Sequence, residues 1–100
     1  MIDFDRVVGF DWDQGNDRKS AEKHDVSRTE AEQVLMNEPL LLLEDGRHSL
    51  AEQRFHALGH TGEGRCLHVT FTLRRENSLI RIISARDMNR KERQYYGQDT

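Results

Sequence analysis

The sequence contains one cysteine, one proline and no long run of apolar residues. The single cysteine, Cys66, excludes an intramolecular disulfide, and its neighbours Leu67 and Val69 indicate a structural residue on a strand. No apolar stretch approaches the ~20 residues that a membrane-spanning helix needs, and the N-terminal segment MIDFD is acidic where a signal peptide would be basic. We therefore expect a soluble cytoplasmic protein without disulfides.

Motifs for a metal or a nucleotide are also missing. Five histidines occur, at positions 24, 48, 56, 60 and 68, but no HExxH motif is present. His56 and His60 fall at a predicted strand end, where a spacing of four does not align metal ligands. Gly59, Gly62 and Gly64 follow a strand without opening a helix, so hairpin flexibility explains them better than phosphate binding. We expect no metal and no cofactor.

The length and composition limit the size of the core. The chain has 100 residues, of which 35% are hydrophobic and 33% charged, so it builds one thin core under a polar surface. We expect a single domain over residues 1–100, of a size that a partner often completes.

The charge is divided unevenly along the chain. Residues 1–53 hold 6 Lys/Arg and 13 Asp/Glu, a net charge of −7, whereas residues 54–100 hold 9 and 5, a net charge of +4. Positive charge gathered in one half of an acidic protein is compatible with an anionic partner such as nucleic acid.

Periodicity and turn signals predict an α+β fold. Ser27 and Glu30 have capping-box spacing, and Pro39 ends the helix that follows. Clean alternation makes residues 65–73 the clearest strand. The predicted strands are 7–12, 40–43, 52–58, 65–73 and 79–85, and the predicted helices are 13–24, 28–37 and 90–96. Short connections favour an antiparallel sheet of about four to five strands, with the first two helices on one face and a short C-terminal helix.

The basic residues of the second half are the main candidates for function. They are Arg54, Arg65, Arg74, Arg75, Arg81, Arg86, Arg90, Lys91 and Arg93. Guanidinium groups bind phosphate in a bidentate fork, so arginines on one sheet face would hold a nucleic-acid backbone. Arg81 stands in an aliphatic strand, where a charge needs a partner or a function. The alternative is that these charges are solvated or paired with the acidic half; His48 is either a loop residue or an acid/base group.

Several segments together resemble the BrnT family of type II toxin–antitoxin toxins, from about Phe10 to Tyr96. They are Phe10-Asp11-Trp12-Asp13, Lys23-His24-x-Val26-Ser27, Glu44-Asp45-x-Arg47-His48, Glu52-x-Arg54-Phe55-x-x-Leu58-Gly59 and Arg81-Ile82-Ile83-Ser84-Ala85-Arg86, with Glu92 and Tyr95 following. The resemblance implies a RelE-like fold, a metal-independent endoribonuclease that arrests growth, and a BrnA-type antitoxin as partner. It is compatible with a heterotetramer of toxin and antitoxin.

On this basis we expect RNA cleavage by attack of the 2′-hydroxyl. Arg81 and Arg86 would hold the scissile phosphate, Arg54 would be a third phosphate contact, and His48 or Tyr95 would move protons. Further RNA contacts are expected from Arg47, Arg74, Arg90 and Lys91.

The sequence departs from the family pattern at Asn16, Ser20, Asp25 and Arg28. Asp25 is expected at a left-handed helix end, which costs a non-glycine residue up to about 1 kcal/mol. The departures favour one alternative, a non-catalytic module that only binds an antitoxin or nucleic acid. Another alternative is a basic RNA-binding domain unrelated to toxins.

Overall fold

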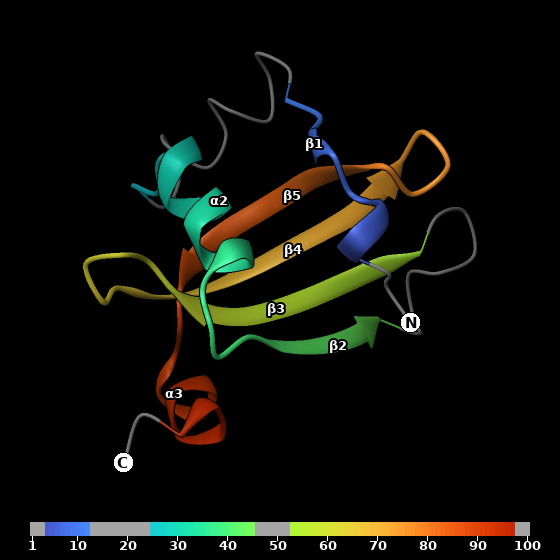
Figure 1. Ribbon diagram of the computed structural model, residues 1–100. Helices are drawn as coiled ribbons and strands as arrows, with labels where there is room; N and C mark the ends of the chain where they lie inside the picture. The colour runs from blue at the N-terminus through green and yellow to red at the C-terminus, as the bar shows by residue number, and fades with distance from the viewer. Residues whose placement is uncertain (1–3, 13–24, 46–52, 98–100) are drawn as a thin grey trace.

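The computed structural model describes residues 4–12, 25–45 and 53–97. Its elements, in order, are η1 (Phe4–Arg6), β1 (Gly9–Phe10), α2 (Arg28–Met36), β2 (Leu41–Asp45), β3 (Arg54–His60), β4 (Cys66–Arg74), β5 (Leu79–Asp87) and α3 (Arg90–Tyr96). Figure 1 shows α2 lying across one face of the sheet and α3 at one end of the strands. The α+β class is confirmed, while the predicted helix 13–24 lies outside the described residues.

The sheet has five strands in the order β1-β5-β4-β3-β2. Strands β2 to β5 form the expected antiparallel meander, but β1 pairs with β5 in parallel. A purely antiparallel sheet was therefore the wrong prediction. After β1 the chain crosses to the far edge, and the meander returns until β5 lies beside β1, running in the same direction (Figure 1). Only Gly9 and Phe10 pair, so the first strand is shorter than residues 7–12.

Helix α2 forms where its capping signals predict. The Ser27 hydroxyl accepts from the amide of Glu30, and the Glu30 carboxylate accepts from the amide of Ser27, so both free amides of the helix start are satisfied. The buried residues Ala31, Val34 and Leu35 lie on one helical face and pack against the sheet. The helix ends at Met36, before Pro39, as predicted.

The covered face of the sheet holds the main core. Its inward residues alternate along the strands and are buried: Phe55, Ala57, Leu67, Val69, Phe71, Ile80, Ile82 and Ala85. Gly59 also lies within β3, where an added Cβ would meet the Val34 side chain at 2.9 Å and the Val34 carbonyl oxygen at 3.0 Å. Hairpin flexibility was therefore the wrong explanation for Gly59, because close packing of α2 on β3 requires the absence of a side chain. Gly64, with φ of 88°, does serve the turn.

Two of the four residues that depart from the family pattern, Asp25 and Arg28, lie within the described part of the chain. Asp25 has φ of 54°, so its predicted left-handed conformation is confirmed. The guanidinium carbon of Arg28 lies 5.0 Å from the centre of the Trp12 ring, a cation–π contact. The Trp12 indole also donates to Glu32 at 2.7 Å, so Arg28 and Glu32 both contact the tryptophan. Asn16 and Ser20 lie outside the described residues.

Helix α3 packs on the opposite face, at one end only. It has the predicted bounds, with Asn89 as N-cap and Gly97 in the left-handed conformation at its end. The buried side chain of Tyr96 contacts a small cluster with Leu58 and Met88, and its hydroxyl donates to the carbonyl of Pro39. The rest of this face is not covered by any described helix and carries the candidate site.

Candidate functional site

The face opposite α2, here called the open face, can be followed by strand register. Residues directly opposite one another form three rows across the strands. The first row is Asp45, Arg54, Thr72 and Arg81; the second is Leu43, His56, Thr70 and Ser84; the third is Leu41, Leu58, His68 and Arg86. The register thus places charged residues at both ends of the face, with His56 between them and His68 in the same row as Arg86.

The first row brings together two of the predicted phosphate ligands. Arg54 and Arg81 flank Thr72, which puts their Cα atoms about 10 Å apart, two strand spacings. Thr72 is only 2% exposed, and its hydroxyl donates to the carbonyl of Gln53 at 2.6 Å. Arg81 lies 3.5 Å from the Asp11 carboxylate, which gives this strand arginine the charged partner that its position requires. Arg74 lies two residues beyond Thr72 on β4, at the end of the strand and opposite Leu79.

Arg86 lies at the other end of the face, fixed by α3. Its guanidinium donates to both carboxylate oxygens of Glu92, at 2.8 and 2.9 Å. This bidentate bond lowers the pKa of Glu92 and raises that of Arg86. Arg86 is five residues from Arg81 on β5, a distance of about 16 Å at strand rise. The two arginines that were predicted to share one phosphate therefore lie at opposite ends of the open face.

A β-bulge explains why both arginines share a face at all. Residues five apart on a regular strand point to opposite faces. Opposite Thr70 and Phe71 the register passes from Ser84 to Ile82, so Ile83 is skipped and the alternation shifts by one. Ala85 consequently enters the core and Arg86 joins Arg81 on the open face.

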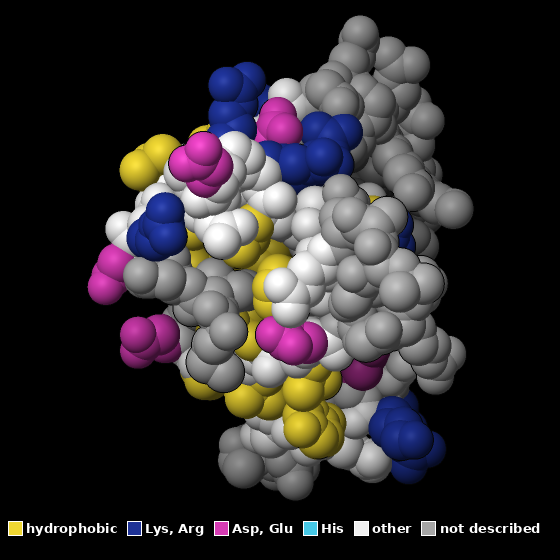
Figure 2. Space-filling view, turned by 90° about the vertical axis from the view of Figure 1, so that its right-hand side faces the viewer, with side chains coloured by type: hydrophobic (Ala, Val, Ile, Leu, Met, Phe, Trp, Pro, Cys, Tyr) yellow, Lys and Arg dark blue, Asp and Glu magenta, His cyan; other side chains and the backbone are white. Residues whose placement is uncertain are grey.

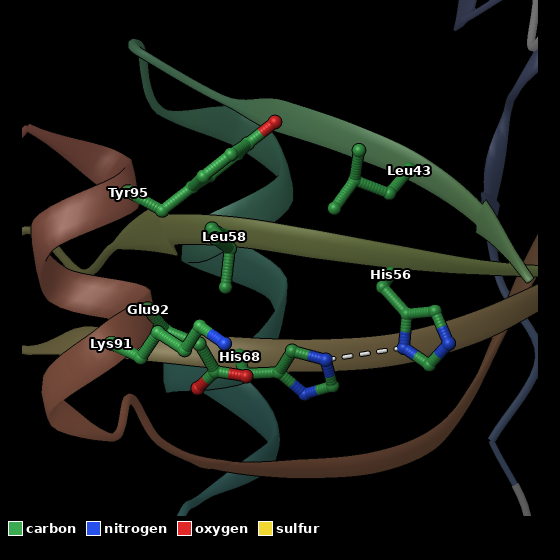
Figure 3. A pocket seen from close by; sticks show the side chains of 7 residues that line it. All are labelled: Leu43, His56, Leu58, His68, Lys91, Glu92 and Tyr95. Atoms are coloured by element: carbon green, nitrogen blue, oxygen red, sulfur yellow. Dashed lines mark hydrogen bonds between the residues drawn. The ribbon is translucent and has the colours of Figure 1, made fainter.

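A pocket of about 310 Å³ lies between α3 and the open face. It is lined by Leu43, His56, Leu58, His68, Lys91, Glu92 and Tyr95. Figure 3 shows the Tyr95 ring extending from α3 over Leu58 towards Leu43. Tyr95 is 64% exposed, in contrast to its buried neighbour Tyr96. Of the residues predicted to act on RNA, Tyr95 and Lys91 therefore meet at this pocket, whereas Arg90 is exposed and does not line it.

The pocket also contains two histidines, His56 and His68, to which we assigned no role from the sequence. His56 Nδ1 lies 3.1 Å from His68 Nε2 and 3.0 Å from the Thr70 hydroxyl. The two rings are 5.0 Å apart between centres, and Figure 3 marks the bond between them. Alternation places both residues on one face, but their contact is diagonal across β3 and β4 and depends on the register of that hairpin. A single sequence does not reveal that register.

The surroundings of the His68 imidazole shift its pKa. Burial, with a smaller effect from the positive charge of Arg86, lowers the pKa of His68 to about 4, so His68 is neutral at pH 7. His68 Nδ1 is buried and has no hydrogen-bond partner among the described residues. His60, on the same strand as His56, instead contacts the Tyr96 hydroxyl at 3.2 Å.

Positive and negative side chains are mixed on the part of the surface that Figure 2 describes. Figure 2, which views the end of the sheet, shows Lys and Arg side chains interspersed with Asp and Glu. Arg65 illustrates the pairing: it binds Glu30 at 3.1 Å and Asp87 at 2.8 Å and so ties the start of α2 to β4 and β5. These carboxylates raise the pKa of Arg65 further.

Two predicted site residues, Arg47 and His48, lie outside the described residues. Within residues 4–12, 25–45 and 53–97, no group of three or more His, Cys, Asp or Glu side chains could hold a metal ion. No helix in these ranges is long and apolar enough to cross a membrane.

The fold and the open face indicate the class of protein. It is a small α+β domain whose mixed sheet presents arginines, imidazoles and an exposed tyrosine on the face that α2 leaves uncovered. The sequence model of the family described as ribonuclease toxin, BrnT, of type II toxin–antitoxin system matches residues 12–92. The chain therefore belongs to the BrnT family, and its resemblance to that family is confirmed. Membership implies an RNA target and an antitoxin partner. A comparison with curated proteins gives no match.

Proposed function

We propose that this protein is a cytoplasmic endoribonuclease toxin with a RelE-like fold, which cleaves RNA without a metal ion and so inhibits translation and growth. Membership of the BrnT family supports ribonuclease activity. The single structural observation that carries the proposal is the open face, on which Arg54, Arg81 and Arg86 share a surface with His56 and His68. Such a surface can hold phosphates and move protons.

The proposed reaction is attack of a 2′-hydroxyl on the adjacent phosphate. Arginines next to the reacting phosphate stabilise the charge that builds up on its oxygens. Because about 16 Å of strand separates Arg81 from Arg86, we assign them to different phosphates of one RNA strand. Arg54 and Arg81 hold the scissile phosphate, while Arg86, Arg74, Arg90, Lys91 and Arg47 contact flanking ones. Tyr95 or His48 remains a candidate for proton transfer.

Production of the protein alone in bacterial cells tests the proposal. We expect growth arrest together with fragmented RNA, and loss of both in the Arg81→Ala/Arg86→Ala double variant. Purified protein should cleave free RNA equally well with and without EDTA. Equal cleavage by the wild type and the folded double variant would refute the arginine assignment, and loss of cleavage in EDTA would refute metal independence.

A second candidate function is a module that binds without cleaving. The observation in its favour is that Arg81 and Arg86 are each paired with a carboxylate, Asp11 and Glu92, which leaves less charge for phosphate. Harmless expression of a folded protein that still binds its antitoxin would support this candidate.

The proposed partner is a BrnA-type antitoxin, assembled with the toxin as a heterotetramer. Co-expression should restore growth, and the mass of the purified complex should correspond to two copies of each chain. Restored growth with a one-to-one complex would retain the partner but contradict the heterotetramer.

A further inference from the structure

The pocket between α3 and the open face contains apolar surface that the core does not use. Among the described residues, four large apolar side chains are exposed, and two of them, Leu43 at 46% and Tyr95 at 64%, line this pocket. The next residue on α3, Tyr96, is buried with Leu58 and Met88, so Tyr96 anchors the helix and Tyr95 does not. Exposed apolar surface gathered in a concave site marks a place where a ligand binds.

The shape of the pocket suits one planar ring. Its volume of about 310 Å³ is at the lower end of the roughly 300–1,000 Å³ that ligand sites occupy. Figure 3 shows the Tyr95 ring together with Leu43 and Leu58 around one part of the pocket, and Lys91 extending from the same helix as Tyr95. Nucleobases stack on exposed aromatic side chains of this kind. A base can therefore stack on Tyr95 and lie against the leucines.

The position of the pocket indicates that the base belongs to an RNA strand. The pocket spans the second and third rows of the open face, with Arg86 in the third row and Arg54 and Arg81 in the adjoining first row. Neighbouring rows are one strand repeat apart, about 7 Å. A strand whose phosphates contact these arginines therefore passes over the pocket. Lys91 is one helical turn before Tyr95 on the same side of α3, where its ammonium group can contact a phosphate.

We propose that this pocket binds one unpaired nucleobase of the RNA, which stacks on the Tyr95 ring while Lys91 contacts the phosphate of the same nucleotide. The inference rests on the proposed function, because RNA is the ligand in both. A base within a duplex is paired and stacked, and it reaches such a pocket only when it is turned out of the helix. The pocket therefore selects single-stranded RNA. This binding role uses the ring of Tyr95, whereas proton transfer would use its hydroxyl.

The test measures binding to a ligand that cannot be cleaved. The first probe is a fluorescein-labelled chain of seven 2′-O-methylated abasic ribose phosphates, and the second is the same chain with a single adenine at its central position. Methylation removes the attacking hydroxyl, so fluorescence anisotropy reports affinity alone. For the wild type, the adenine should raise the affinity about 5- to 150-fold, the usual contribution of one base stacked on an aromatic side chain.

Variants of the two helix residues separate stacking from charge. Tyr95→Ala should abolish the difference between the probes, and Tyr95→Phe, which keeps the ring, should restore it. Lys91→Gln should weaken binding of both probes by the same factor, because a phosphate contact does not depend on the base. It should also reduce the slope of log affinity against log salt concentration by about 0.7, whereas Tyr95→Ala should leave that slope unchanged.

The matched control is Met36→Ala, which removes another exposed apolar side chain, on α2 and so on the other side of the sheet. This variant should bind both probes as the wild type does. Circular dichroism and thermal unfolding show whether each variant is folded. The selection of single strands is tested with a labelled RNA hairpin, in which wild-type cleavage should map to the unpaired loop.

The outcomes distinguish this inference from the proposed function. If the wild type binds the adenine probe more tightly but cleaves no RNA, the pocket stands and the ribonuclease is refuted. If the wild type cleaves RNA but binds both probes equally, or if folded Tyr95→Ala keeps the preference for adenine, the ribonuclease stands and the pocket is wrong. Equal cleavage of the stem and the loop would overturn the selection of single strands. A Tyr95→Ala variant that keeps the preference for adenine but no longer binds a co-expressed antitoxin would assign the pocket to that partner instead.

Discussion

The two faces of the sheet are built from alternate residues of the same strands and are used differently. On the covered face, Phe55, Val69 and Phe71 are at most 5% exposed and pack under α2. On the open face, their sequence neighbours are arginine, histidine and threonine, held by hydrogen bonds and ion pairs. Because successive residues of a strand point to opposite faces, the residues that stabilise the fold alternate with those proposed to act on RNA. Substitutions at adjacent positions can therefore be compared directly.

The largest expected effect comes from the covered face. Phe71 is fully buried and its ring stacks on Phe55 at 5.5 Å between centres. Phe71→Ala should lower the free energy of unfolding by about 3–5 kcal/mol, because it removes apolar contact and leaves a cavity. Urea denaturation followed by circular dichroism measures this loss.

The adjacent residue provides the matched control. Thr72→Val keeps the shape of the side chain on the open face and removes only the hydrogen bond to Gln53, so it should cost about 1 kcal/mol. Equal losses for both variants would contradict the division of the sheet into a stabilising and a chemical face.

The next effect concerns activity and belongs to the open face. Arg54→Gln should lower RNA cleavage about 100-fold, since a donor aimed at the scissile phosphate is removed. Its unfolding midpoint should stay close to that of the wild type. Arg93→Gln, on the exposed side of α3, serves as the control and should cleave within about twofold. If both variants lose activity equally, non-specific charge rather than the row of Arg54 and Arg81 governs catalysis.

A smaller effect is that His68, on the open face, makes the free energy of unfolding depend on pH. The pKa of His68 falls from 6.5 to about 4 on folding, so between these values the unfolded chain binds a proton that the folded chain does not. Stability must therefore fall as the pH is lowered from 6.5 towards 4. We expect a loss of at most about 2 kcal/mol between pH 6.5 and 4.5, because solvent screening around the partly buried side chain reduces the full effect of the shift.

His68→Gln isolates this contribution. Denaturation at both pH values should show a clearly smaller loss in the variant than in the wild type. The ion pair of Glu92 with Arg86 does not account for a loss of stability between pH 6.5 and 4.5. The pKa of Glu92 is lowered, so this pair is lost only at more acidic pH. An unchanged pH dependence in the variant would show that His68 is not the responsible group.

Local signals predicted most of the covered face and of the helices. The capping box predicted at Ser27 and Glu30 marks the start of α2, because it depends on residues only three apart, and the structure shows a second such box at the start of α3, at Asn89 and Glu92. Alternation in β3 and β4 assigned the core side correctly, since its period of two is a local property. Gly59 was misjudged because the close approach of Val34 is visible only once the helix is docked.

The candidate site depends on contacts that are not local. The pairing of Arg81 with Asp11 follows from β1 lying parallel beside β5, and these residues are far apart in sequence. The bulge at Ile83 places Arg86 on the open face, against the regular alternation. The contact of His56 with His68 follows from the register of β3 and β4. The residue types therefore predicted that arginines lie on a sheet. Which of these side chains lie close together depends on how the strands pair, and that could not be predicted from the sequence.

The smallest expected effect lies outside both faces, at the start of α2. Asp25 has φ of 54°, a conformation that glycine adopts without the steric cost of a Cβ, and glycine is the residue expected there from the family pattern. Asp25→Gly should therefore raise the free energy of unfolding by up to about 1 kcal/mol. Arg65 donates to the carbonyl of Asp25 at 2.8 Å, a backbone contact that the substitution retains. Asp25→Ala is the control: it keeps the Cβ and should not stabilise the protein. Thermal unfolding of the two variants distinguishes backbone strain from a charge effect, because only strain predicts that glycine and alanine differ.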